Sequence, residues 1–184
     1  ARQYYHHVAA FPTYLSAVHA RCDDQSTRKQ LLDNLVDEEA GTPNHPELWL
    51  NFTEGLGVSA QHARNAEKWP ETKNLVDTFR SVCRDESTAE ALAALYAYES
   101  QIPAICESKI DGLKKHYSFA DPKHYEYFSV HIEADREHAA AEQRLLGGYV
   151  STQNFESVRV SVNRVLDALW EMLSGVCRRH AIAC

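Results

Sequence analysis

The feature that most constrains the fold of this chain is an apolar seam with two charged residues inside it. Between residues 87 and 116, apolar side chains recur at alternating steps of three and four residues, the period of one face of an α-helix. The seam consists of Leu92, Leu95, Glu99, Ile102, Cys106, Lys109 and Leu113. A buried ionised carboxylate is costly unless it is paired, protonated or bound to a cation. Glu99 therefore needs a partner, unless the seam rotates outward after Pro103.

The rest of the chain shows the same helical period. Helices are predicted near residues 4–22, 28–40, 47–56 and 71–84, from a cap at Thr152 or Asn154 to about residue 179, and briefly after Ser59. Pro12 should kink or reset the first of these, and Pro103 should bend the helix of residues 87–116. The last helix is expected to bury a face that includes Trp170 and Leu173. Helices joined by short loops predict an all-α bundle of about seven helices, in one domain over residues 1–184.

Three potential metal ligands lie on one further helix. Asp121-Pro122 should open this helix and Gly147-Gly148 should end it, and it carries His131, Asp135 and His138 at offsets of four and three residues. These offsets place two imidazoles and a carboxylate on one face. A solvated or internally paired helix face is the alternative to a metal site.

An acidic helix end followed by a histidine offers further ligands. Glu38 and Glu39 lie at the end of the helix of residues 28–40, and His45 follows in the loop. Helical phase does not choose between the two glutamates, because each continues one of two possible apolar seams. An acidic helix end is also common on a solvated surface.

Composition and charge exclude several classes of function. The net charge of -7 and the absence of a lysine and arginine cluster argue against a nucleic-acid partner. The five cysteines contain no C-x-x-C pair, which indicates reduced thiols and a cytoplasmic protein. No apolar run is long enough to span a membrane, and the first residues lack the charged start and apolar core of a signal peptide, so we expect a protein that is not exported. Residues 1–8 read as helix interior without a start signal, so we expect the first helix to be truncated or absent here.

Several of these segments carry a resemblance to a known family. The motifs are Asn34-Leu-Val-Asp-Glu-Glu-Ala-Gly with His45-Pro-Glu-Leu-Trp49, Tyr96-Ala-Tyr98-Glu99-Ser-Gln-Ile-Pro103 with Lys109 ten residues after Glu99, and His131-x-x-x-Asp135-x-x-His138. Together they resemble the haem-oxygenase-like di-metal oxidases, and within them the para-aminobenzoate synthase branch typified by the chlamydia protein associating with death domains. The thiaminase II and cofactorless quinone-synthase branches share that fold.

The resemblance implies a six-ligand site for two metal ions. The implied ligands, contributed by three helices and one loop histidine, are Glu38, His45, Glu99, His131, Asp135 and His138. Three imidazoles and three carboxylates without a thiolate suit an Fe/Fe or Mn/Fe pair, whereas zinc favours a closed tetrahedral set. A carboxylate bound between two divalent ions would also explain why Glu99 lies in an apolar seam. Protonation of the histidines should expel the metals in mild acid.

The resemblance further implies an oxidase that makes 4-aminobenzoate for folate and consumes its own side chains. Dioxygen and an external reductant would be its partners, Lys109 would donate the amino nitrogen, and the ring-donating tyrosine falls upstream of Ala1. Tyr98 and Tyr127 are candidate substitute or radical-relay tyrosines, and the family implies a homodimer. Two alternatives are a same-fold oxidase of a small diffusible amine or acid, and a protein-binding module of the death-domain-associating type.

Overall fold

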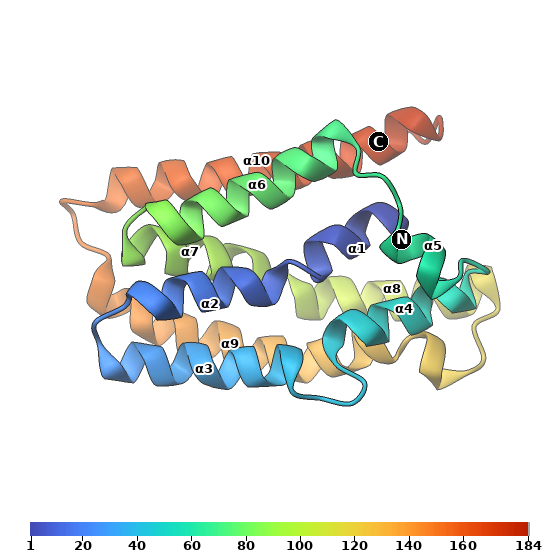
Figure 1. Cartoon of the computed structure of the whole chain (residues 1–184), viewed down its shortest axis with the longest axis horizontal. Helices are drawn as coiled ribbons and strands as arrows, with labels where there is room; N and C mark the ends of the chain where they lie inside the picture. Colours follow the sequence, from blue (N-terminus) through green and yellow to red (C-terminus); the bar gives the residue numbers. More distant parts are fainter. Residues whose placement is uncertain (184) are drawn as a thin grey trace.

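The computed structural model describes residues 1–183, and these form helices and connecting loops without a β-strand (Figure 1). In chain order the elements are α1 (Arg2–Val8), α2 (Phe11–Arg21), α3 (Gln25–Glu39), α4 (His45–Gly55), α5 (Ala60–Arg64), α6 (Pro70–Asp85), α7 (Thr88–Glu99), α8 (Ile102–Tyr117), the 3-10 turn η1 (Pro122–His124), α9 (Glu126–Tyr149) and α10 (Phe155–Arg179). The predicted all-α class is confirmed.

Two of the predicted helices are each divided into two segments. The first is interrupted at Ala9 and Ala10, and Pro12 lies in the first turn of α2. The second is interrupted at Ser100 and Gln101, and Pro103 likewise lies in the first turn of α8 rather than at a bend within one helix. Proline suits a first helical turn because its missing N–H needs no partner there. If each divided helix counts once and the short α5 counts as a connection, the described residues form the predicted seven.

Capping residues set several helix starts. Asp24 accepts from the Thr27 backbone N–H at the start of α3, and Ser87 forms a capping box at the start of α7. Asn44 forms a second capping box with Glu47. Consequently His45 is the first residue of α4, and its predicted position in a loop is wrong.

The end of α9 also differs from the prediction. The helix continues through Gly147 and Gly148 to Tyr149, and the chain becomes extended at Val150. The Tyr149 hydroxyl lies 3.0 Å from Thr27 Oγ1 in α3, so a tertiary contact holds the last turn that the glycines alone would not favour.

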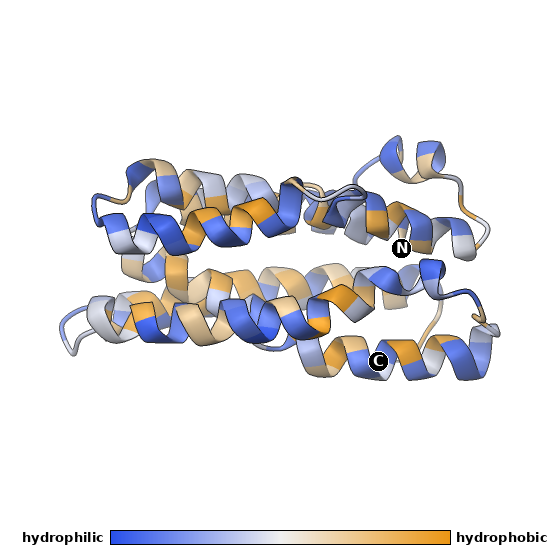
Figure 2. Ribbon diagram, turned by 90° about the horizontal axis from the view of Figure 1, so that it is seen from below, coloured by the Kyte–Doolittle hydropathy of each residue, from blue (hydrophilic) through white to orange (hydrophobic). Residues whose placement is uncertain are grey.

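The helices pack around a continuous core. In Figure 1, α6 and α10 run side by side along one edge of the molecule, α3 and α9 lie along the opposite edge, and α2 lies between α3 and α6. Helix α9 packs most extensively against α7 and α8, and it also packs against α3 and α4. Apolar residues alternate with polar ones along the outer helices in Figure 2. The largest fully buried apolar side chains are Tyr14, Phe79, Phe128, Leu15, Leu75, Leu92, Leu95 and Met172.

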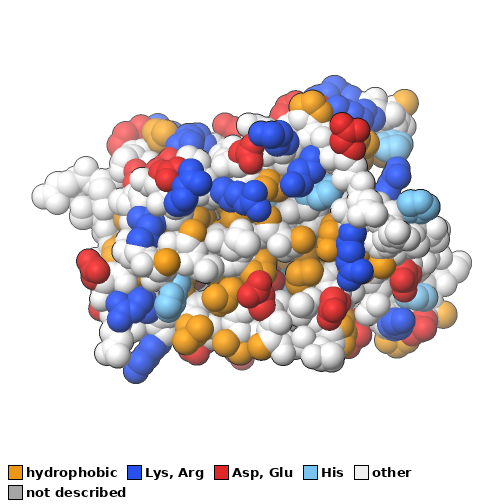
Figure 3. Space-filling view, in the orientation of Figure 1, with side chains coloured by type: hydrophobic (Ala, Val, Ile, Leu, Met, Phe, Trp, Pro, Cys, Tyr) orange, Lys and Arg blue, Asp and Glu red, His pale blue; other side chains and the backbone are white. Residues whose placement is uncertain are grey.

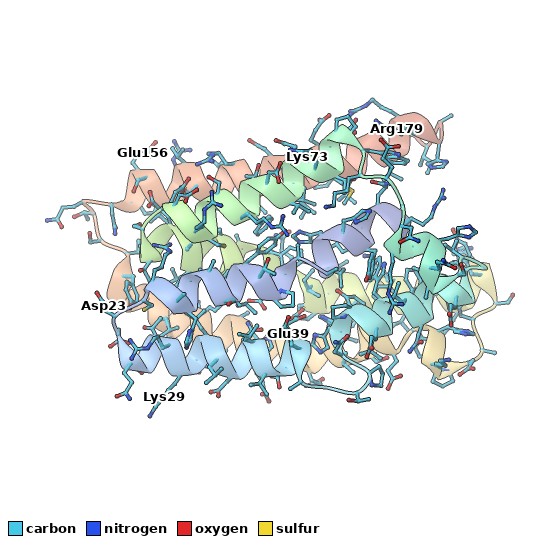
Figure 4. All side chains as sticks on the ribbon, in the orientation of Figure 1. Asp23, Lys29, Glu39, Lys73, Glu156 and Arg179 are labelled. Carbon is cyan, nitrogen blue, oxygen red and sulfur yellow. The ribbon has the colours of Figure 1, made fainter. Side chains whose placement is uncertain are left out.

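The buried face of α10 is rotated from the predicted one. Trp170 is 68% exposed and Leu173 is 40% exposed, so the prediction that both are buried is wrong. The buried stripe instead includes Ala168 and Gly175. A Cβ at Gly175 would lie 3.1 Å from the Glu71 carboxylate of α6. Arg179, labelled in Figure 4, donates to the same carboxylate. Glycine suits position 175 because α10 and α6 approach closely there.

The surface carries both signs of charge. Acidic and basic side chains are interspersed on the face shown in Figure 3, which agrees with the absence of a single basic field. None of the helices among residues 1–183 is long and apolar enough to cross a membrane.

The cysteines only partly match the prediction of five reduced thiols. Cys22, Cys83 and Cys106 are free and buried. Cys177 is disulfide-bonded, so the prediction is wrong for that residue. Cys184 lies outside the described residues.

Candidate metal centre

Four helices bring the six predicted ligands into the core as two groups of three. Glu38, His45 and His131 form the first triad, and Glu99, Asp135 and His138 form the second. Within each triad, one potential ligand atom per residue lies within 4.8 Å of the other two, and all six side chains are buried. The site thus draws on α3, α4, α7 and α9.

The first triad is rich in imidazole. His45 Nδ1 lies 3.0 Å from Glu38 Oε1, and His131 Nε2 lies 3.9 Å from the same oxygen. His131 Nδ1 donates to the Tyr127 carbonyl oxygen at 2.5 Å, one turn earlier in α9. Because that carbonyl can only accept, Nε2 is the nitrogen with a free electron pair, and it faces Glu38.

The second triad is rich in carboxylate. His138 Nδ1 lies 3.6 Å from both Glu99 Oε1 and Asp135 Oδ1, while His138 Nε2 lies 3.0 Å from Asp37 Oδ2. An imidazole held by a carboxylate on one nitrogen presents the other nitrogen to a metal in many metal sites. Asn34 Nδ2 donates to Glu99 Oε1 at 2.9 Å and orients that carboxylate.

Several buried polar atoms of this site have no hydrogen-bond partner. They are His138 Nδ1 and Glu99 Oε2 of the second triad and His45 Nδ1 of the first, which is close to Glu38 Oε1 without forming a hydrogen bond to it, and the Glu99 residue is only 1% exposed. An unpaired buried polar group is costly, and one divalent cation in each triad would satisfy these three atoms. The triads also border a shared cavity of about 10 Å³ that Glu38, Glu99, His131 and Asp135 help to line. The donor set and these open positions fit a pair of metal ions.

The two triads differ in their protonation. Burial, together with the neighbouring His45, lowers the pKa of His131 to about 3, so this imidazole is neutral. Burial raises the pKa of Asp135 to about 7. Burial opposes the charged form of His138, but the negative carboxylates of Asp135 and Glu99, each 3.6 Å from its Nδ1, prevail and raise its pKa to about 11. Burial opposes the charged form of His45, but the Glu38 carboxylate prevails and raises its pKa. A metal ion would therefore compete with protons in both triads.

A seventh ionisable residue at the site was missed from the sequence. Glu142 is buried, and both of its carboxylate oxygens lack a hydrogen-bond partner. Burial, and next the charge of Glu99, hold the pKa of Glu142 well above its usual range. The available signal was its offset of four residues from His138, which continues the same face of α9. Asn34 and Asp37, which orient Glu99 and His138, were missed too.

The three residues predicted to act in catalysis lie in two places. Tyr98 and Tyr127 are buried and line the small cavity between the triads. Burial raises both of their pKa values well above 10, so both hydroxyls keep their protons. Lys109 does not join the triads.

Lys109 borders a separate, larger cavity. This cavity has a volume of about 310 Å³ and is lined by Tyr4, Trp49, Phe52, Lys109, Leu113, Tyr117, Phe128 and Met172, among others. Lys109 Nζ lies 5.5 Å from the centre of the Tyr4 ring and 5.4 Å from that of Phe128. The residue keeps solvent contact through the open cavity, but the protein atoms crowded around its amine lower the Lys109 pKa.

One hydrogen bond connects the two cavities. The Tyr4 hydroxyl, at the larger cavity, lies 2.8 Å from the Tyr98 hydroxyl, at the triads. Tyr127 also packs edge-on against Trp49 of the larger cavity, with ring centres 4.8 Å apart. The metal-ligand triads and the Lys109 cavity are therefore adjacent and joined by aromatic side chains.

Comparisons with known proteins agree with this geometry. Residues 1–170 match the family described as iron-containing redox enzymes. A 4-aminobenzoate synthase of Chlamydia pneumoniae is 47% identical over 175 residues, covering 95% of this chain and 78% of that protein. A 4-aminobenzoate synthase of Nitrosomonas europaea is 44% identical and covers 96% of this chain and 76% of its own length.

A solved structure shows the same fold. A Shewanella denitrificans protein described as having a heme oxygenase-like fold superposes with a TM-score of 0.84 at 17% identity. The match covers 98% of this chain and 77% of that one.

Proposed function

The chain belongs to the haem-oxygenase-like family of iron-containing redox enzymes and is an oxidoreductase, and from this premise we propose that it makes 4-aminobenzoate at a di-metal centre. Two relatives of that name, at 47% and 44% identity, support the product. The observation that carries the proposal is the position of two buried metal-ligand triads next to a cavity that holds the Lys109 amine.

The six triad residues would hold two iron ions, or one manganese and one iron. Imidazole and carboxylate ligands without a thiolate suit these metals. When bound, the pair would supply the electrons and open positions that activate dioxygen. The protein would hold His131 through the Tyr127 carbonyl and His138 through Asp37, so that both imidazoles keep a fixed nitrogen toward the metals.

Lys109 would provide the amino nitrogen of the product. A lowered pKa leaves more of its amine unprotonated, with a free electron pair, than in an exposed lysine. The surrounding aromatic rings form a cavity large enough for a benzoate-sized molecule. A tyrosine of the same protein would provide the ring, and the protein would then be consumed.

Tyr98 and Tyr127 would pass oxidising equivalents from the centre toward this cavity. Both residues border the space between the triads, and the Tyr98 hydroxyl is hydrogen-bonded to Tyr4. A tyrosine loses an electron most readily when its proton has an acceptor, and the Tyr4 hydroxyl oxygen is positioned as one. This arrangement would separate the site of oxygen activation from the site where the product forms.

The test uses protein in which every lysine carries ¹⁵N. The purified enzyme is loaded with Fe(II), or with Mn(II) and Fe(II), and exposed to air with a reductant. We expect ¹⁵N-labelled 4-aminobenzoate, in an amount no greater than the enzyme, and no product from Lys109→Ala. Lys115→Ala is the matched control, because Lys115 is exposed on the same helix. Unlabelled product, product in large excess over enzyme, or full yield from Lys109→Ala would contradict the self-sacrificing mechanism.

The alternatives give different results in the same assay. An oxidase of a small diffusible amine or acid would show multiple turnovers that depend on an added substrate. A protein-binding module would keep its partner after the triads are removed. We further propose a homodimer that receives electrons from an external reductant in the cytoplasm, and these points stay predictions.

A further inference from the structure

Glu142 is a buried acidic residue that has no assigned role in the six-ligand site. It lies in α9, one turn beyond His138, and is 3% exposed. Helix α9 presents His131, Asp135, His138 and Glu142 at steps of four, three and four residues, so the fourth side chain continues the ligand face.

Burial and the neighbouring carboxylates of Glu99 and Asp135 disfavour a charged Glu142. The charge of Glu99 acts on Glu142, and two carboxylates cannot bond to one another without a shared proton or a cation. Neither of its oxygens has a hydrogen-bond donor, and Glu99 Oε2 has none either. A cation between the two carboxylates would satisfy all three oxygens.

Glu142 borders a small cavity that adjoins the second triad at His138. This cavity of about 10 Å³ lies between α3 and α9 and is lined by Asn34, His138 and Glu142, among others, whereas Glu99 and Asp135 line the other small cavity. That volume is close to the size of one water molecule or ion. His138 thus borders this cavity as well as belonging to the second triad. Asn34 also donates to Glu99, so the same side chains link this cavity to that triad.

Charge balance supports the same reading. The six predicted ligands contain three carboxylates, which leave one excess positive charge when two divalent ions are bound in a buried site. Adding Glu142 gives four carboxylates and a neutral centre. A neutral buried cluster avoids the large cost of an uncompensated charge in the protein interior.

We propose that Glu142 is an additional carboxylate ligand of the ion held by Glu99, Asp135 and His138. This inference deepens the proposed function and rests on its metal centre. With Glu142 the second position has three carboxylates and one imidazole, whereas the first has one carboxylate and two imidazoles. The oxygen-rich position suits Mn²⁺, and the nitrogen-rich position suits Fe²⁺.

The experiment measures metal binding and does not depend on activity. Metal-free wild type and Glu142→Gln are titrated with Mn(II), and free Mn(II) is followed by electron paramagnetic resonance. Glu137→Gln is the matched control, because Glu137 is exposed on the same helix and loses the same charge. We expect the wild type and the control to bind two equivalents of Mn(II) each. In Glu142→Gln the second equivalent of Mn(II) should bind with about 10- to 100-fold lower affinity.

The alternative role of Glu142 predicts the opposite result. If Glu142 were a protonated partner that donates to Glu99, then glutamine, which also donates, would leave both affinities unchanged or tighter. That outcome would overturn the proposal while leaving the metal centre intact. A wild type that binds no metal would overturn the centre itself, and the inference with it.

A second measurement covers the case in which Glu142→Gln does not fold. Crystals of the wild-type protein are soaked in Mn(II), and the ion is located by its anomalous scattering. A Glu142 oxygen at roughly 2.2 Å from the ion of the second triad supports the proposal, since this is a typical carboxylate–metal distance. An ion bound by that triad with Glu142 turned away overturns it.

Discussion

The Nε2 atom of His138 lies 3.0 Å from Asp37 Oδ2, and this contact fixes which imidazole nitrogen faces the second triad. Asp37 belongs to α3, one residue before Glu38, so a single helix end contributes a ligand to one triad and an orienting carboxylate to the other. The two triads are therefore linked through α3.

Replacing that orienting carboxylate should weaken one metal position. In Asp37→Asn the amide oxygen still accepts from His138, but without the charge that strengthens the imidazole as a ligand. We expect the affinity of the second triad for Mn(II) to fall about 10-fold or more, as measured by equilibrium dialysis. Asp33→Asn, on the exposed side of the same helix, is the control. Equal affinities for the two variants would contradict the orienting role.

Glu38 and Glu39 provide a matched pair of substitutions. Glu38 is buried beside His45 and His131, whereas Glu39 is exposed at the end of α3, where Figure 4 labels it. Glu38→Ala removes the sole carboxylate of the first triad, so we expect metal content to fall from two equivalents to one. The Glu39→Ala variant should keep two equivalents of metal. The measurement is elemental analysis of protein loaded with metal and desalted, and equal metal contents would count against the assigned ligand.

Metal binding should release protons. His138, whose pKa is raised to about 11, carries a proton at neutral pH, and Asp135, with a pKa of about 7, carries one below that pH. A metal ion displaces both protons, so its apparent affinity should fall as the pH is lowered, by about tenfold per pH unit for each proton released. His131, with a pKa of about 3, contributes nothing in this range.

The number of released protons can be measured by calorimetry. Titrations at about pH 6 and pH 8, each in two buffers of different ionisation enthalpy, should show more protons released per ion at the lower pH. A binding constant independent of pH would indicate that the second triad does not hold the metal.

The hydrogen bond between Tyr98 and Tyr4 should matter more for activity than for folding. Tyr98→Phe removes one hydrogen bond of 2.8 Å, which typically contributes about 1 kcal/mol to stability. We expect a small decrease in Tm and a large loss of 4-aminobenzoate yield. Tyr96→Phe, on the same helix and partly exposed, is the control. A Tyr98→Phe enzyme with full yield would exclude Tyr98 from the proposed transfer route.

Helical periodicity alone was enough to predict the class of fold and the common helix face of three site residues. His131, Asp135 and His138 lie on a common face because steps of three and four residues are a local property of any α-helix. The need of Glu99 for a partner followed equally from its place in an apolar seam, and the structure buries it beside two further ligand candidates.

Only the tertiary structure decided how the helices turn toward one another. It buries Glu38 and exposes Glu39, it turns Trp170 out of the core, and it places Lys109 in a neighbouring cavity. It also brings Glu142 close enough to Glu99 for their charges to interact. The four-residue step from His138 to Glu142 could have been recognised in the sequence. These outcomes depend on the rotation and separation of helices that are distant in sequence, and a pattern within one helix does not contain that information.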